Sequence, residues 1–178
     1  MRSIAEALYS MLPAFEPLGD ERLLLVEASG RYIAREVRAG VDSPPFDNSA
    51  MDGYAVRSSD VESAGPGRAV ELPVRGESRA GVPLPGPLEP VAACRIFTGA
   101  PMPPGADAVV IQEDTQRVGD RVQILEASPR AKHVRPQGSD VSHGAVLLHP
   151  GDRIGPGEIG LLASQNIDHV DVYRRPEV

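Results

Sequence analysis

A length of 178 residues is enough for one ordinary domain or two small ones, and it allows a real hydrophobic core. A formal net charge of -7 and a pI near 5.1 leave no basic stripe, so we expect no binding to nucleic acid. Eighteen prolines and eighteen glycines predict many turns and short elements, and exclude a fold built from long helices.

Cys94 is the single cysteine and lies in an apolar segment, which predicts a buried thiol and no internal disulfide. No apolar run approaches the roughly 18 residues that a membrane span needs. The first residues lead directly into an amphipathic segment rather than a signal sequence. These features predict a cytoplasmic protein that does not bind membranes.

The first predicted element is a short helix with one apolar stripe. Four apolar residues recur at helical spacing: Ile4, Leu8, Met11 and Leu12. Ser3 can cap this helix together with Glu6, and Pro13 ends it. Residues 21–38 then predict a strand, a turn at Gly30 and a second strand, with a helix over 29–35 as the competing interpretation.

The middle of the chain predicts short β-strands separated by turns and loops. The expected strands lie at 54–56, 69–74, 94–97, 108–111 and 122–125, the last as an arm of a hairpin. Residues 44–128 are therefore expected to be all β. Further on, a strand at 146–148, a short helix at 157–164 and a strand at 169–172 are predicted. The fold class is mainly β with a few short helices (α+β).

Three segments could carry chemistry. The first holds Asp47, Asn48, Ser49 and Asp52 on a predicted turn. Two carboxylates five residues apart could ligate a hard cation such as Mg²⁺ or orient a polar substrate. Alternatively, these side chains satisfy backbone donors within the turn.

The second segment places Thr98 and Gly99 at the end of a strand, just before a proline-rich loop. A hydroxyl and closely approaching backbone N–H groups could hold an oxyanion, although each proline removes a donor. A stiff loop joining two strands explains the same residues equally well.

The third segment has Arg135 and Asp140 on either side of a glycine turn. A guanidinium can bind an oxyanion through two hydrogen bonds while the carboxylate positions a partner. A surface Arg and Asp near a glycine are, however, usually solvated and have no function.

A fourth pattern, GPGEIG at 155–160, matches the glycine spacing of dinucleotide-binding loops. Pro156 removes one of the amides that such a loop needs. A proline and a glutamate in the first turn of a helix explain the pattern better.

Together and in this order, the three segments resemble the N-terminal half of MoeA-type molybdopterin molybdenumtransferases, a family that includes the C-terminal domain of gephyrin. The resemblance is carried by SPPFDNSAMDGYAVR at 43–57, IFTGAPMPPGADAVV at 96–110 and VRPQGSDVSHGAVLLHPGDRI at 134–154. It extends over essentially the whole chain.

This resemblance implies the last step of molybdenum cofactor synthesis. Molybdate would be inserted into adenylylated molybdopterin, with release of AMP, in a Mg²⁺-dependent reaction. Asp52, Asp140 and Thr98 carry over as catalytic residues and Arg135 as a cofactor-binding residue. Asp52 and Asp140 would position Mg²⁺ or the oxyanion, and no residue decides between molybdate and tungstate. The resemblance also implies a homodimer whose active sites are shared between subunits.

For architecture, the resemblance implies an elongated mixed β domain from residues 18–44 and 141–178. This domain would carry an inserted β-rich, barrel- or roll-like domain at 45–140. An N-terminal helical segment at 1–17 would pack on a molybdopterin-binding domain that begins, in the family, near the end of this sequence. We therefore expect an N-terminal fragment that is inactive alone, whose uncovered helix stripe makes residues 1–14 self-associate or become disordered.

One departure from the family pattern concerns the third segment. Many relatives have R-R-G-E-D where this chain has RPQGSD at 135–140, so one positive charge and one carboxylate are missing. This weakens the case for Arg135 and leaves Asp140 in place. The alternative function is a non-catalytic binding or scaffolding module with the same fold.

Overall fold

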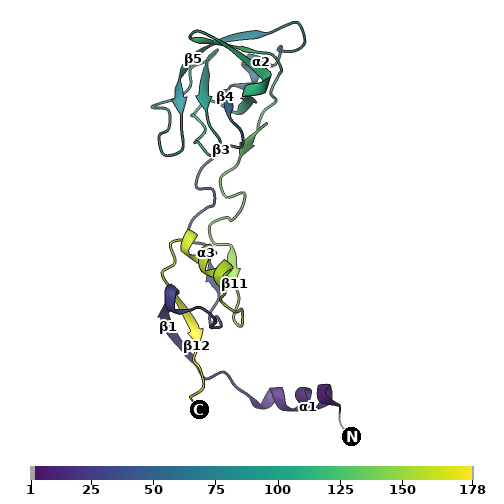
Figure 1. The fold of residues 1–178 in the computed structure, drawn as a ribbon, viewed down its shortest axis with the longest axis vertical. Coiled ribbons are helices and arrows are strands. Elements are labelled where there is room, and N and C mark those ends of the chain that lie inside the picture. Colours follow the sequence, from purple (N-terminus) through teal and green to yellow (C-terminus); the bar gives the residue numbers. More distant parts are fainter. Residues whose placement is uncertain (1–2, 178) are drawn as a thin grey trace. The chain divides into compact units, whose positions relative to one another are not determined.

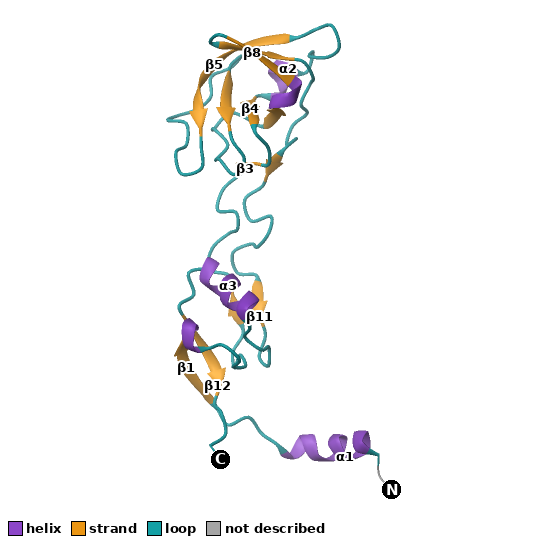
Figure 2. Ribbon diagram, in the orientation of Figure 1, coloured by secondary structure: helices purple, strands orange, loops and turns teal. Residues whose placement is uncertain are grey.

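A computed structural model describes residues 3–177, and the chain divides into two compact units. Unit 1 comprises Met1–Val41 and His143–Val178, and unit 2 comprises Asp42–Ser142 (Figure 1). The regular structure is mostly β with three short helices, which confirms the predicted fold class (Figure 2). None of the helices in the described part of the chain has the length and apolarity needed to cross a membrane.

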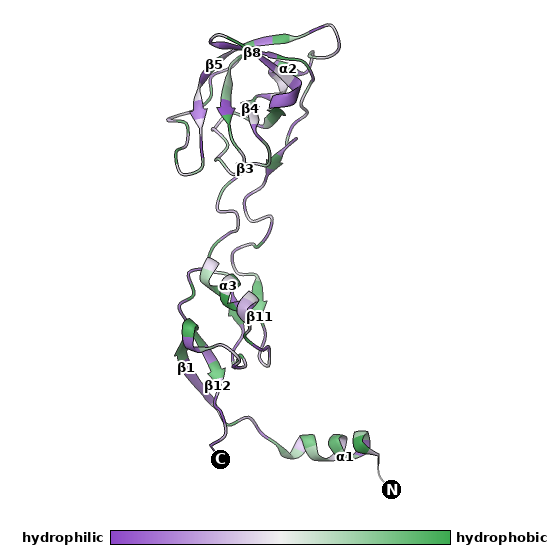
Figure 3. Cartoon of the chain, viewed as in Figure 1, coloured by the Kyte–Doolittle hydropathy of each residue, from purple (hydrophilic) through white to green (hydrophobic). Residues whose placement is uncertain are grey.

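The N-terminal helix of unit 1 forms as predicted. Helix α1 spans Ile4–Met11, and a 3-10 turn, η1, follows at Leu12–Ala14 with Pro13 inside it. Ser3 accepts a hydrogen bond from the Glu6 amide while Glu6 accepts one from the Ser3 amide, which completes a capping box. The apolar side chains of α1 are exposed (green in Figure 3). Self-association through this stripe stays a prediction.

Two antiparallel strand pairs build the rest of unit 1. Strand β1 (Asp20–Leu24) pairs with β12 (His169–Tyr173), and β2 (Val37–Arg38) pairs with β11 (Val146–Leu148). Helix α3 (Pro156–Ser164) completes the unit. The core between these elements includes Leu25, Ile33, Ile154, Leu162 and Val172.

The predicted strand, turn and strand at 21–38 form only in part. Strand β1 ends at Leu24, and the next residues form a 3-10 turn, η2, at Leu25–Glu27 that buries Leu25. Tyr32 and Ile33 make isolated bridges instead of a strand. The competing helix over 29–35 is wrong. The secondary structure of residues 21–38 depends on which single side chains are buried. The local spacing of apolar residues does not show this.

The GPGEIG segment forms a helix start. Gly155 is the N-cap, Pro156 occupies the first helical turn, and the Glu158 carboxylate accepts a hydrogen bond of 2.9 Å from the Gly155 amide. The glycine spacing therefore reflects helix capping.

Arg31 is the buried cation of unit 1. Its side chain is only 9% exposed, forms an ion pair with Glu21, and donates a 2.7 Å hydrogen bond to the Tyr173 carbonyl. We expect Glu21→Ala to lower the free energy of unfolding by about 1–3 kcal/mol, because a buried guanidinium loses its partner. Urea unfolding measures the change. Glu36→Ala breaks an exposed pair with Arg38 and should cost less than about 1 kcal/mol; equal effects would contradict the prediction.

Unit 2 is built on a curled six-stranded sheet in the order β7-β4-β6-β5-β9-β8. The central strand β4 (Gly53–Val56) pairs antiparallel with β6 (Ala93–Ile96) and β7 (Ala108–Ile111). Strand β5 (Val70–Ser78) runs parallel to β6 and antiparallel to β9 (Arg121–Ile124), which forms a hairpin with β8 (Thr115–Val118). The 3-10 turn η3 lies at Gln112–Asp114.

A short helix, α2 (Ser58–Val61), corrects the all-β expectation for residues 44–128. The Asp107 carboxylate accepts hydrogen bonds from the Ser58 amide at 2.6 Å and from its hydroxyl at 3.1 Å. Asp107 lies 49 residues away, so no local capping pattern could predict this helix. Its buried Val61 joins the core on one sheet face.

The two faces of β4 pack against two apolar cores. Tyr54 and Val56 belong to one core and Ala55 to the other, as the alternation of a strand requires. Cys94 on β6 is buried in the second core, as predicted. Burial raises the pKa of its thiol to about 11.

Candidate functional site

The structure brings the three predicted segments together in unit 2. Strand β3 (Asn48–Ser49) pairs antiparallel with β10 (Val134–Arg135). On the other side, the Ser49 amide donates to the Ala100 carbonyl at 3.0 Å and the Gly99 amide donates to the Ser49 carbonyl at 2.8 Å. Backbone hydrogen bonds therefore hold the first segment between the second and the third.

Asp52 and Thr98 form the first pair of candidate site residues. The Thr98 amide and hydroxyl each donate a 2.8 Å hydrogen bond to the same carboxylate oxygen, Oδ1 of Asp52. The hydrogen bond from the Thr98 amide, and then the one from its hydroxyl, hold the pKa of Asp52 below its usual range. Desolvation opposes them, and the positive charge of Arg95 is the smallest of the effects that lower the pKa. Asp52 is therefore ionised at neutral pH and can only accept hydrogen bonds.

The amides of the Thr98 loop are engaged within the protein. The Thr98 amide donates to Asp52, the Gly99 amide to Ser49 and the Ala100 amide to the Phe97 carbonyl. In this conformation they are not directed at an oxyanion. The loop instead fixes the orientation of the Asp52 carboxylate.

Arg135 and Asp140 form the second pair. Their side chains lie 2.7 Å apart, Nη2 to Oδ2, and both are about half exposed. The Asp140 amide donates to the Ser43 carbonyl at 2.9 Å, which fixes the backbone of this turn. An exposed ion pair of this kind contributes at most about 1 kcal/mol to the free energy of unfolding. Stability alone therefore gives little reason for the presence of this pair.

The residues that depart from the family pattern are part of this turn. The Gln137 amide donates to Asp47 at 2.8 Å, and its side-chain amide donates to Asp42 at 2.7 Å. The Ser139 hydroxyl lies 3.4 Å from Asp140. Gln137 and Ser139 therefore help to order the loop that carries Asp140.

The two pairs are joined through β3, and together they do not make a closed metal site. Among residues 3–177, no group of three or more His, Cys, Asp or Glu side chains could hold a metal ion. Mg²⁺ usually takes one or two carboxylates and completes its shell with water and substrate phosphates. Asp52 and Asp140 could each supply one ligand, with the others coming from outside these residues.

Asn48 on β3 is a buried residue of the first segment, and its Oδ1 has no hydrogen-bond partner among the described residues. Ser49 is fully buried, and its hydroxyl donates to the Met51 carbonyl at 2.6 Å. Both residues shape the loop that ends in Asp52.

Sequence reasoning missed Arg95, which connects several parts of the site. Its guanidinium donates to the Gly53 carbonyl at 3.0 Å and to the Gln112 side chain at 3.1 Å. It also lies over the rings of Tyr54 and Phe97, at 5.3 and 4.7 Å from their centroids. The alternation of Arg95 and Phe97 along the predicted strand was the only signal in the sequence, because Tyr54 comes from β4 and Gln112 from η3.

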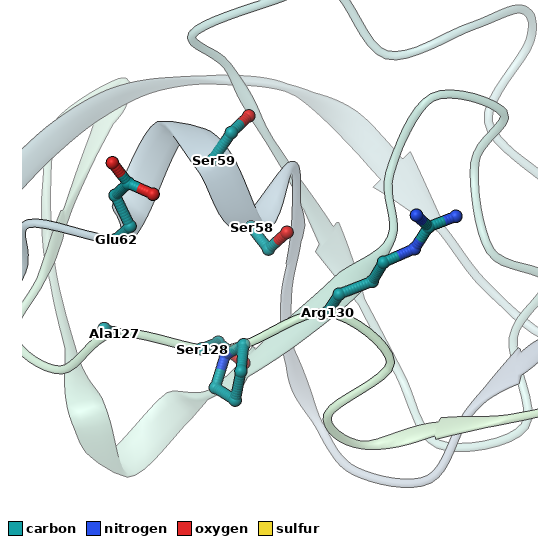
Figure 4. Close-up of a pocket in the computed structure, with 7 residues that line it drawn as sticks. Ser58, Ser59, Glu62, Ala127, Ser128 and Arg130 are labelled. Carbon is teal, nitrogen blue, oxygen red and sulfur yellow. The ribbon is translucent and has the colours of Figure 1, made fainter.

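Unit 2 also contains a separate pocket of about 380 Å³ between α2 and residues 127–130 (Figure 4). Two of the three serine hydroxyls that line it are engaged, because Ser58 donates to Asp107 and Ser128 to the Val109 carbonyl. Glu62 and Arg130 lie on opposite sides of the pocket in this view. None of the predicted site residues lines it.

Comparison with known proteins identifies the family. Residues 2–165 match the family described as MoeA N-terminal region (domain I and II). The chain is 38% identical to a molybdopterin molybdenumtransferase of Nostoc sp. and 39% identical to molybdopterin molybdenumtransferase 2 of Mycobacterium tuberculosis. Both matches cover 100% of this chain, but 41% and 44% of the respective relatives.

A solved structure gives the same result for the fold. The molybdopterin biosynthesis moeA protein from Pyrococcus horikoshii OT3 matches with a TM-score of 0.91 and 33% identity, over 97% of this chain and 46% of that one. The chain thus spans less than half the length of these relatives. Its sequence and its fold place it in the MoeA N-terminal region family, comprising domains I and II.

Proposed function

We propose that the complete protein inserts molybdate into adenylylated molybdopterin and releases AMP. The observation that carries this proposal is the match of the whole chain to proteins named molybdopterin molybdenumtransferase. The juxtaposition of the Asp52–Thr98 pair and the Arg135–Asp140 pair along β3 and β10 supports it, because the residues that the family resemblance assigns to the site lie on joined segments.

In this proposal the chain supplies fixed charges rather than a nucleophile. Asp52 stays ionised, held by Thr98, and acts as a hydrogen-bond acceptor for a substrate hydroxyl or a water molecule. Arg135 offers a cation near Asp140 that can meet an oxyanion of the substrate. The anionic substrate would otherwise be repelled by the two carboxylates.

Three further features belong to the same proposal. Asp52 and Asp140 would hold Mg²⁺ together with ligands from outside these residues, and the ion would supply positive charge for the substrate phosphates. A homodimer would complete each site with residues from the rest of the protein. The cytoplasm is the proposed compartment, and the buried, unpaired thiol of Cys94 is compatible with a reducing environment.

The test is an assay of the complete protein with adenylylated molybdopterin and Mg²⁺, in which AMP release and reconstitution of a molybdenum-free apoenzyme are measured. We expect both to depend on molybdate, and residues 1–178 alone to give neither. Asp140→Asn should lower the rate by about tenfold or more, because one charge of the site is lost. Asp120→Asn is the control, an exposed residue of the β8–β9 turn whose replacement should leave the rate unchanged.

The same assay separates the proposal from its alternative, a non-catalytic binding or scaffolding module. That alternative is favoured by the missing charges at Gln137 and Ser139. A complete protein that binds adenylylated molybdopterin and releases no AMP with either molybdate or tungstate would establish the module and exclude the enzyme. Release with tungstate only would correct the metal and keep the reaction class.

A further inference from the structure

We propose that Arg95 is a positioning residue that fixes the Asp52–Thr98 pair, through its hydrogen bonds to Gly53 and Gln112 and its contacts with the rings of Tyr54 and Phe97. The proposal deepens the proposed function and rests on it for the chemistry that the pair serves. Its test needs no substrate, so this proposal and the proposed function can fail independently of each other.

The backbone geometry places Arg95 at the junction of three strands. On β6 it lies opposite Tyr54 of β4 and Glu77 of β5. Residues two apart on a strand share a face, so Phe97 follows Arg95 on the same side of the sheet. Arg95 is half-buried and can therefore contact the aromatic rings of Tyr54 and Phe97. Its guanidinium nitrogens at the same time donate hydrogen bonds to Gly53 and Gln112.

Each hydrogen bond of Arg95 acts on a neighbour of the pair. The Gly53 carbonyl, an acceptor at 3.0 Å, belongs to the residue directly after Asp52. The side-chain oxygen of Gln112 accepts a hydrogen bond from Arg95 at 3.1 Å. The backbone amide of Gln112 donates to the Asp52 carbonyl at 3.0 Å. Phe97, which the guanidinium overlies, directly precedes Thr98. The one guanidinium thus touches the chain on both sides of the Asp52–Thr98 contact.

The planar, forked guanidinium group of arginine suits this arrangement better than the side chain of any other cationic residue. Arginine can donate two parallel hydrogen bonds and stack on aromatic faces at the same time, whereas lysine offers a compact, mobile ammonium group. The other charged residues on the neighbouring elements are Glu71, Arg75 and Glu77 of β5, Arg79 directly after β5, Glu113 and Asp114 of η3, and Arg135 of β10. Arg79 is paired with Glu77 and lies 6.0 Å from the Phe97 centroid.

The experiment uses NMR on the 178-residue chain, recording the pH titration of the Asp52 carboxyl carbon and hydrogen exchange at the Thr98 amide. We expect Arg95→Met to move the Asp52 titration to higher pH and to speed Thr98 exchange at least about fivefold. Arg95→Lys keeps the charge and loses the fork, so the titration should stay near that of the unmodified chain while exchange is still faster. If Arg95 only stabilised the fold, the Asp52 titration and the Thr98 exchange would not respond differently to Arg95→Lys.

Arg79→Met is the matched control, since it removes a neighbouring guanidinium that makes no hydrogen bond to Gly53 or Gln112. It should change neither readout. A folded Arg95→Met chain with unchanged Asp52 titration and unchanged Thr98 exchange would overturn the proposal. If Arg95→Met does not fold, Arg95→Lys decides alone, and unchanged Thr98 exchange in that variant overturns it.

Discussion

Replacing Gly53 by alanine is expected to unfold unit 2. A Cβ atom at this position would overlap the Val110 carbonyl oxygen, and would lie 2.9 Å from its carbon and 3.0 Å from the Ile111 Cα. These are backbone atoms of β7, so no side chain can rotate away, and β4 must separate from β7. We expect a loss of more than about 4 kcal/mol in the free energy of unfolding.

Urea unfolding followed by the NMR signals of the ring of Tyr54, the one tyrosine within residues 42–142, measures this loss for unit 2. Gly65→Ala is the control in the same unit, because nothing lies within 4 Å of a Cβ built there. That variant should stay within about 0.5 kcal/mol of the original chain. A Gly53→Ala chain as stable as Gly65→Ala would show that the sheet can open at this point without cost.

Gly53 also shows what the family resemblance leaves unexplained. The run M-D-G-Y-A identifies the family, but it does not separate residues kept for chemistry from residues kept for packing. The structure gives a packing reason for Gly53, which lets two backbones approach closely, and it shows that Asp52 accepts two hydrogen bonds from Thr98.

Elements with a local signal were predictable from the sequence. The capping residues Ser3 and Glu6 defined the start of α1, and the apolar runs of the interior strand β6 and the edge strand β7 predicted both strands nearly to their ends. The hairpin of β8 and β9 followed from the turn at Gly119 and Asp120. In each case the residues that stabilise the element lie within it or next to it.

Elements fixed by distant residues were not predictable. Helix α2 depends on the Asp107 carboxylate, and η2 depends on the burial of Leu25 against residues more than a hundred positions later. The candidate site shows the same limit. The sequence placed Arg135 and Asp140 on one turn, and Asp52 and Thr98 on two separate segments. The contact between Asp52 and Thr98, and the connection of the two pairs through β3, come from pairing across the unit.

The second large effect is expected for Asp52→Asn in the complete protein. Asparagine has nearly the same shape and can still accept hydrogen bonds from Thr98, so the loop should keep its structure while the negative charge is lost. If the ionised carboxylate acts in the reaction, kcat should fall by about 10²- to 10³-fold. A folded variant whose molybdate-dependent AMP release is within twofold of the original would remove Asp52 from the site.

Thr98→Val tests how Asp52 is kept ionised, through the pH dependence of the same reaction. The two Thr98 hydrogen bonds favour the charged form and hold the pKa of Asp52 below its usual range, so activity should persist until the pH falls through that lowered pKa. Valine removes the hydroxyl bond and raises the pKa, which should move the acid limb of kcat/KM to higher pH, whereas Thr98→Ser should leave the limb in place. In Asp52→Asn this limb should be absent, and adding Thr98→Val should then cost little more, because the two residues act as one unit.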